Sequence, residues 1–258
     1  MSARSSTAIS VALVALVGAV APACNKGQAS ETEVMFAVAQ SLRNVMPELA
    51  GAYAAGHPGV KIAATYGASG DLRKQVEGGA PIDGVIFASS KPVADLIAER
   101  KVSAGSRRLL ATNQLVLIGP KGAAPLTFAS IDQLPDNEKL CIGDPGAVPA
   151  GQYARDYLEK LGKWSQLKAR TVLGGDVAAV LAYTRRGEVA AAIVYRTEVR
   201  GIDDVVVLDR AGADAPRVEV VAGVVSEGKA SAQAEAFLGF VSSKEGQKLL
   251  VDFGFGPP

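Results

Sequence analysis

Short apolar segments alternate with amphipathic ones along most of this chain. Runs rich in Val, Ile, Leu and Ala predict nine strands, at residues 34–38, 60–66, 84–88, 115–119, 139–143, 169–173, 191–195, 204–208 and 218–225. Stretches with a helical period lie between most of them, such as KPVADLIAER and AQAEAFLGFVSS. Apolar strands that alternate with amphipathic helices are typical of mainly parallel sheets with helices on both faces. The pattern therefore predicts an α/β protein, built either as one domain or as two lobes.

Four of the predicted helices begin with small or capping residues directly after a strand. These starts are Ser41, Ser69, Ala150-Gly151 and Asp176-Val177. Open α/β sheets place their ligands at such turns, and the unpaired N–H groups of a helix N-terminus suit an anion. Ser and Asp are also ordinary N-caps, so capping alone explains each start taken singly. An anion site requires that the four starts converge, which periodicity does not determine.

The first 23 residues have the pattern of an export signal. Arg4 precedes an apolar run over residues 8–21, which is too short to predict a membrane span. The next residues fit the small-x-small rule for signal cleavage, and APAC also resembles a bacterial lipobox that ends at Cys24. We predict a signal peptide of the lipoprotein type over residues 1–23, with Cys24 as the lipidated first mature residue. A free exported protein is the alternative.

Charge and composition argue against several classes of function. Without the signal peptide the chain loses Arg4 and has 26 basic and 26 acidic residues, with no basic run. This balance favours neither nucleic acid nor an anionic membrane surface as a partner. His57 is the only histidine, and Cys141 lies in the apolar run KLCIG, where we expect a small buried side chain. A His and Cys metal cluster cannot be assembled, and a Ser-His-Asp triad would have to use His57.

The segment DPGAVPAGQYARDYLEKLG, residues 144–162, leads from a predicted strand into a helix through two prolines and several small residues. It resembles the signature Asp-Pro-x-x-Val-Pro-Ala-Gly-x-Tyr-Ala of periplasmic molybdate-binding proteins, the solute receptors of molybdate ABC importers. Four further segments resemble the same family and occur in its order: AVAQSL, YGASGDLRKQVEGGAPID, GDVAAVLAYTRRGEVAAAIVY and the terminal FGF. The resemblance covers about residues 33–256.

The resemblance implies a two-lobed periplasmic-binding-protein fold of type II, with the ligand in the cleft between the lobes. One lobe would comprise residues 31–113 and 222–258, and the other residues 114–221. The ligand would be molybdate or tungstate, without a cofactor or a direct metal-ion ligand. The protein would be a monomer that delivers the anion to the membrane subunits of an ABC importer.

Carried over position by position, the family's contacts to the oxyanion fall on Ser41, Ser69, Ala150, Val177 and Tyr195. The serines would give hydroxyl and N–H donors, the two apolar residues backbone N–H groups, and the tyrosine its phenolic O–H. Such neutral donors reject a protonated oxyanion, because a donor that faces a donor costs about 1–3 kcal/mol. Size would then separate molybdate or tungstate from the smaller sulfate.

Small residues at the start of the signature helix suit the approach of an oxyanion to the backbone. Pro149 removes one N–H group and biases Val148 to an extended conformation. Ala150 and Gly151 are then expected to leave the following N–H groups uncovered. This part of the sequence predicts a binding function for the turn beyond its role as a connection.

Two residues depart from the family's pattern near the first serine. Gln40 stands where the family usually has a small Ala, and is expected either to crowd the ligand or to bond to it. Pro47 falls inside the predicted first helix and would kink it near Met46.

Three alternatives remain open. The first is a receptor for another oxyanion, such as sulfate or phosphate. The second is an enzyme on the same bilobal scaffold, and the third is the effector domain of a regulator. The lack of a base and nucleophile pair opposes the enzyme, since Asp83, Asp144 and Asp176 occupy strand-start, turn and cap positions. The export signal and the absence of a DNA-binding segment oppose the regulator.

Overall fold

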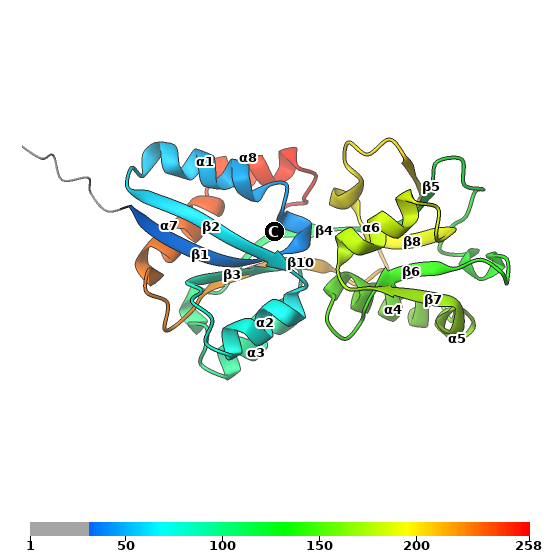
Figure 1. Cartoon of the computed structure of the whole chain (residues 1–258), viewed down its shortest axis with the longest axis horizontal. Helices are drawn as coiled ribbons and strands as arrows, with labels where there is room; N and C mark the ends of the chain where they lie inside the picture. The colour runs from blue at the N-terminus through cyan, green and yellow to red at the C-terminus, as the bar shows by residue number, and fades with distance from the viewer. Residues whose placement is uncertain (1–30) are drawn as a thin grey trace, which may run out of the picture. The chain divides into compact units, whose positions relative to one another are not determined.

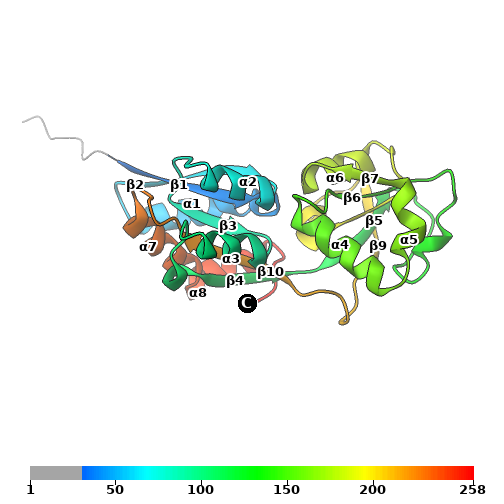
Figure 2. The same ribbon diagram turned by 90° about the horizontal axis from the view of Figure 1, so that it is seen from below.

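The computed structural model describes residues 31–258, and the predicted signal peptide and Cys24 lie outside the described residues. The described part forms two five-stranded sheets, each flanked by helices (Figure 1 and Figure 2). We refer to each sheet with its helices as a lobe. Within residues 31–258, no helix is long and apolar enough to cross a membrane.

The sheet of the first lobe has the strand order β2-β1-β3-β10-β4. Its strands are β1 Thr32–Ala39, β2 Val60–Gly67, β3 Gly84–Phe87, β4 Arg108–Asn113 and β10 Val218–Val224. Strand β1 pairs in parallel with β2 and β3, whereas β10 pairs antiparallel with β3 and β4. The chain therefore returns to this sheet after it has built the second one.

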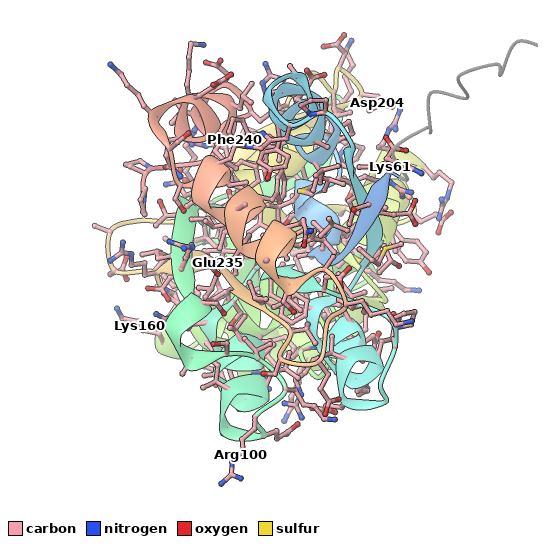
Figure 3. The ribbon with its side chains drawn as sticks, turned by 90° about the vertical axis from the view of Figure 1, so that its left-hand side faces the viewer. Lys61, Arg100, Lys160, Asp204, Glu235 and Phe240 are labelled. Carbon is pink, nitrogen blue, oxygen red and sulfur yellow. The ribbon has the colours of Figure 1, made fainter. Side chains whose placement is uncertain are left out.

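Helices cover both faces of this sheet because consecutive residues of its central strands are apolar, which places apolar side chains on each face. The helices are α1 Met46–Gly56, α2 Ser69–Glu77, α3 Ser90–Ala98, α7 Ser231–Val241 and α8 Lys244–Asp252. Phe36 of β1 packs in one apolar cluster with α1, α7 and α8, and the next residue, Ala37, packs in a second cluster with α2 and α3. Between α1 and α7 the ring centre of Tyr53 lies 5.3 Å from that of Phe237 and 5.6 Å from that of Phe240. Figure 3 labels Phe240 on α7.

The sheet of the second lobe has the order β7-β6-β8-β5-β9. Its strands are β5 Leu115–Pro120, β6 Leu140–Gly143, β7 Thr171–Gly174, β8 Ala191–Tyr195 and β9 Val205–Arg210. Helices α4 Pro149–Lys160 and α5 Trp164–Leu167 lie on one face, and α6 Val177–Arg185 on the other (Figure 1). Cys141 is fully buried under α6, as expected of a small apolar side chain, and burial raises the pKa of its thiol to about 12.

All nine predicted strands are present, and the α/β fold is confirmed, but both sheets are mixed. In the second lobe β6 pairs in parallel with β7 and β8, whereas β5 pairs antiparallel with β8 and β9. Strand β4 was not predicted, because only its two central residues are buried and the apolar run is too short. The predicted boundary at residue 221 falls inside β10, whose residues pair throughout with the first sheet. The division of the chain into lobes at particular residues stays a prediction.

The predicted kink at Pro47 was wrong. A 3₁₀ turn, η1 Gln40–Leu42, follows β1, and α1 begins only at Met46. Pro47 therefore lies in the first turn of the helix, where its missing N–H group costs no intrahelical hydrogen bond. The segment between β1 and α1 is a turn, and Ser41 lies in that turn.

Candidate functional site

The five predicted contact residues line one cavity at the ends of the strands. Ser41 follows β1 in η1, Ser69 opens α2 after β2, and Ala150 lies in the first turn of α4 after β6. Val177 opens α6 after β7, and Tyr195 ends β8. The structure brings these residues together from both lobes around a cavity of about 10 Å³.

The cavity is lined almost entirely by small and neutral residues. The lining comprises Ala39, Gln40, Ser41, Gly67, Ala68, Ser69, Ala88, Val148, Pro149, Ala150, Asp176, Val177 and Tyr195. None of these described residues is Lys or Arg. The one carboxylate, Asp176, caps α6 by accepting a hydrogen bond from the N–H of Ala179 at 2.8 Å. Any charge that the cavity binds must be compensated by dipoles and hydrogen-bond donors.

The two serine hydroxyls are buried and free to donate. The Oγ atom of Ser41 is buried without a hydrogen-bond partner among the described residues, and the residue is 9% exposed. Ser69 is 1% exposed, and its Oγ accepts a hydrogen bond from the N–H of Ala88 at 3.2 Å. This acceptor role leaves the proton of the Ser69 hydroxyl available. A buried hydroxyl without a partner costs about 1–3 kcal/mol, so its presence at Ser41 points to a missing acceptor.

Three helix N-termini contribute backbone donors. Ser69, Ala150 and Val177 lie in the first turns of α2, α4 and α6, where N–H groups have no partner within the helix. The aligned peptide dipoles add partial positive charge at each of these ends. Together they form an electrostatic environment that favours an anion.

Pro149 and Gly151 of the signature segment are required for different structural reasons. Val148 is extended, with φ −103° and ψ 112°, as the following Pro149 predicts. A Cβ atom on Gly151 would lie 1.8 Å from the carbonyl oxygen of Gly143, at the end of β6. The expected role of Gly151 was to uncover N–H groups, but the close packing of α4 on β6 is what requires this glycine.

Tyr195 contributes a protonated phenol. It is 1% exposed, and its O–H donates a long hydrogen bond of 3.4 Å to the carbonyl oxygen of Ala88. Burial raises the pKa of Tyr195 well above its ordinary range, so the hydroxyl remains a donor. The turn η5 Arg196–Val199 follows, where Arg196 donates to the Gly254 carbonyl of the C-terminal turn. Arg200 lies over the ring of Phe253, at 5.1 Å from its centre. These contacts with the FGF segment hold the end of β8 in place.

Sequence reasoning missed two groups at or near the site. Ala88, at the end of β3, bonds both candidate hydroxyls, through its N–H to Ser69 and its carbonyl to Tyr195. The rule that ligands lie at strand ends was the signal for it. The second group is Glu198, whose Oε1 is buried without a partner in the described chain. Burial, with a smaller contribution from the charge of Asp176, raises the pKa of the Glu198 carboxyl to about 7.

The acidic residues considered for catalysis have structural partners. The carboxylate of Asp83 accepts hydrogen bonds from the N–H groups of Met35 and Ala230, each at 2.8 Å. Asp144 accepts from Gly146 N–H at 2.9 Å within its own turn. With Asp176 as a helix cap, the three do not form a cluster around one substrate position.

Residues 34–256 match the family of bacterial extracellular solute-binding proteins. The chain belongs to this family. The molybdate-binding protein ModA of Haemophilus influenzae is 33% identical to this solute-binding protein over 232 residues, 88% of this chain and 91% of the relative. YvgL of Bacillus subtilis, named as a substrate-binding lipoprotein of an ABC transporter, is 32% identical over 240 residues, 90% and 91% of the two chains.

A solved structure supports the same assignment at the level of the fold. The periplasmic molybdate-binding protein of Azotobacter vinelandii aligns with a TM-score of 0.77 at 20% identity, over 87% of this chain and 99% of that one. The predicted family and the two-lobed periplasmic-binding-protein fold are therefore confirmed. Proteins of this family are extracellular solute-binding proteins.

Proposed function

We propose that this solute-binding protein is the receptor of an ABC importer and binds molybdate or tungstate as a tetrahedral dianion. The ligand would lie in the cavity lined by Ser41, Ser69, Ala150, Val177 and Tyr195, between the two lobes. The observation that carries the proposal is the buried hydroxyl of Ser41, which has no acceptor in residues 31–258. An oxyanion in the cavity supplies one.

The donor set favours a fully deprotonated oxyanion. Each group offered by the three helix N-termini, the two serines and the tyrosine can donate, and the backbone N–H groups among them cannot accept. The high pKa of the Tyr195 phenol keeps its proton in place. A dianion accepts from all of them, whereas a protonated phosphate oxygen would face a donor with a donor. The cavity therefore disfavours phosphate species that carry a proton at neutral pH.

Among the deprotonated oxyanions, similarity to relatives supports molybdate as the ligand. The identity of 33% to a protein named for molybdate binding extends over 88% of this chain. Sulfate meets the same chemical requirement, so discrimination against it depends on size. The lining of the cavity comes from both lobes, so the lobes must separate to admit the ligand.

The proposed location follows from the sequence before the described part of the chain. Export by the signal peptide and lipidation of Cys24 would hold the receptor at the outer face of the membrane, near the membrane subunits that accept the anion. The relative named as a lipoprotein supports this arrangement. The receptor would act as a monomer and perform no chemistry on its ligand.

Calorimetric titration of the mature chain tests the function. We expect tight binding of molybdate and tungstate, weak binding of sulfate and none of phosphate at pH 7. Ser69→Ala should weaken molybdate binding by at least about tenfold, because it removes a buried donor to a charged group. Ser165→Ala in α5 is the matched control, since its side chain is exposed. Failure of the folded protein to bind molybdate or tungstate would reject the proposal. Tight binding of sulfate would identify sulfate as the ligand instead.

A further inference from the structure

The two lobes are joined by a direct backbone hydrogen bond beside the candidate site. The N–H of Gly70, in the first turn of α2, donates to the carbonyl oxygen of Ala147 at 3.0 Å. Ala147 lies in the turn between β6 and α4. The neighbours of this pair in the sequence, Ser69 and Val148, line the cavity. The first turn of α2 therefore lies against the second lobe at the edge of the site.

Only glycine permits this approach at position 70. A Cβ atom there would lie 2.8 Å from the oxygen, 3.0 Å from the Cα and 3.3 Å from the carbonyl carbon of Ala147. All three are backbone atoms, so a change of rotamer cannot relieve the contact. The φ angle of Gly70 is not in the left-handed region, and α2 by itself accepts alanine. The requirement for glycine therefore comes from the other lobe.

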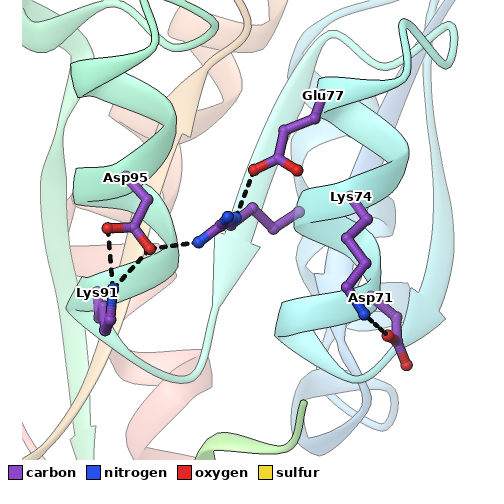
Figure 4. Close-up of polar contacts among 6 residues, drawn as sticks. Asp71, Lys74, Glu77, Lys91 and Asp95 are labelled. Atoms are coloured by element: carbon purple, nitrogen blue, oxygen red, sulfur yellow. Dashed lines mark hydrogen bonds and ion pairs between the residues drawn. The ribbon is translucent and has the colours of Figure 1, made fainter. Parts of the chain in front are cut away.

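The first-lobe side of this contact is held by ion pairs. Arg73 of α2 lies between Glu77 of its own helix, at 2.5 Å, and Asp95 of α3 (Figure 4). Lys91 pairs with the same Asp95 at 2.8 Å. These contacts tie α2 to α3, so the first turn of α2 cannot shift easily away from an added methyl group.

The second-lobe side is a hydrogen-bonded turn. The carbonyl oxygen of Asp144 accepts from the N–H groups of Ala147 at 3.1 Å and Val148 at 2.7 Å, and its carboxylate accepts from Gly146 at 2.9 Å. Pro149 then fixes the entry into α4. Two rigid backbone segments thus meet through one hydrogen bond.

We propose that Gly70 and Ala147 form a closure latch, a hydrogen bond that is made only when the lobes close and that sets how closely they approach. The latch deepens the proposed receptor function, because the distance it fixes also fixes the size of the cavity that holds the oxyanion. A cavity of about 180 Å³ lies directly outside it, lined by residues of both lobes that include Gly70, Lys74, Lys91, Ala147 and Gln152. Closing the latch separates this outer space from the ligand.

The Gly70→Ala variant tests the latch, with Gly51→Ala as the matched control. Gly51 also lies in a helix, α1, and a Cβ atom there would meet nothing within 4 Å. Small-angle scattering measures the separation of the lobes with and without molybdate, and calorimetry measures affinity. We expect Gly70→Ala to fold normally, to have a larger radius of gyration than the wild type in both states, and to bind molybdate at least tenfold more weakly. The control should match the wild type in all measurements.

These measurements test the latch and the receptor function separately. If Gly70→Ala binds within twofold of the wild type and scatters identically, the latch is wrong and the receptor function stands. If the wild type binds none of molybdate, tungstate, sulfate and phosphate, the receptor function fails, and the ligand-free scattering still tests the latch. Identical ligand-free curves for the variant and the wild type would then reject it, whereas a larger radius of gyration for Gly70→Ala alone would support it.

Discussion

Replacement of Ser41 by alanine is expected to stabilise the ligand-free protein and to weaken binding of molybdate at the same time. The residue is 9% exposed, and its Oγ has no hydrogen-bond partner in residues 31–258. A buried hydroxyl without a partner costs about 1–3 kcal/mol, and alanine removes that cost without changing the backbone. We expect the free energy of unfolding to rise by about 1 kcal/mol, which corresponds to about 2–4 °C in Tm for a chain of this size.

The effect of the same substitution on binding has the opposite sign. A hydrogen bond to a charged group contributes about 1.5–3 kcal/mol, so its loss should raise the Kd for molybdate by roughly 10- to 150-fold. Thermal unfolding without ligand measures the first effect, and calorimetric titration measures the second, with Ser165→Ala as the exposed control. A Tm for Ser41→Ala below that of the wild type would refute the reasoning, because it would mean that a protein group pairs with this hydroxyl. An unchanged Kd would remove Ser41 from the site.

Three further predictions concern other buried groups. Tyr195→Phe removes a donor whose only hydrogen bond in the described chain is the 3.4 Å bond to Ala88, so Tm should change little while molybdate binding weakens by about tenfold in calorimetry. Gly151→Ala places a Cβ atom 1.8 Å from the Gly143 oxygen and should lower the free energy of unfolding by several kcal/mol in urea denaturation, unlike Gly51→Ala. The pKa of the Glu198 carboxyl is about 7 in the folded protein and 4.5 ordinarily. The stability that its protonated form contributes is therefore fully present below pH 4.5 and is lost as the pH rises through 7. Glu198→Gln should therefore flatten the decline of Tm between pH 5 and 8 that we expect of the wild type, and an equal decline in both would contradict the assignment.

The order of strands and helices was predictable because most strands of this fold are buried on both faces. Such strands appear in the sequence as apolar runs, and the helices between them carry clear start and stop residues. Strand β4 was not predicted because only Leu110 and Ala111 are buried within it. Its place beside β10 is a tertiary pairing between residues more than a hundred positions apart, which no local pattern encodes.

The candidate site was predictable only where a local signal marked it. Serine after a strand, and proline followed by small residues at a helix start, are visible in the sequence. The roles of Gly70 and Ala88 were not, because both arise from backbone groups that meet across the fold. The burial of Glu198 likewise depends on how η5 packs near the start of α6.

Selectivity between molybdate and sulfate is expected to depend on closure more than on the individual donors. Both anions are acceptor-only dianions at neutral pH, so the loss of the Ser41 hydroxyl should weaken binding of both by a similar factor. The spacing of donors across the cleft is set by backbone contacts, above all the 3.0 Å bond between Gly70 and Ala147. Gly70→Ala widens that spacing, and the smaller sulfate loses more contacts across a wider cleft than molybdate does.

We therefore expect both affinities to fall in Gly70→Ala while the ratio of molybdate to sulfate affinity rises, and we expect Ser41→Ala to leave that ratio within about twofold of the wild type. Competition calorimetry with the two anions measures the ratio directly. An unchanged ratio in Gly70→Ala would mean that anion size is sensed by a contact inside the cavity. Gln40, which lines the cavity and departs from the family's pattern, would then be the residue to replace by alanine, because its side chain can restrict the space beside Ser41.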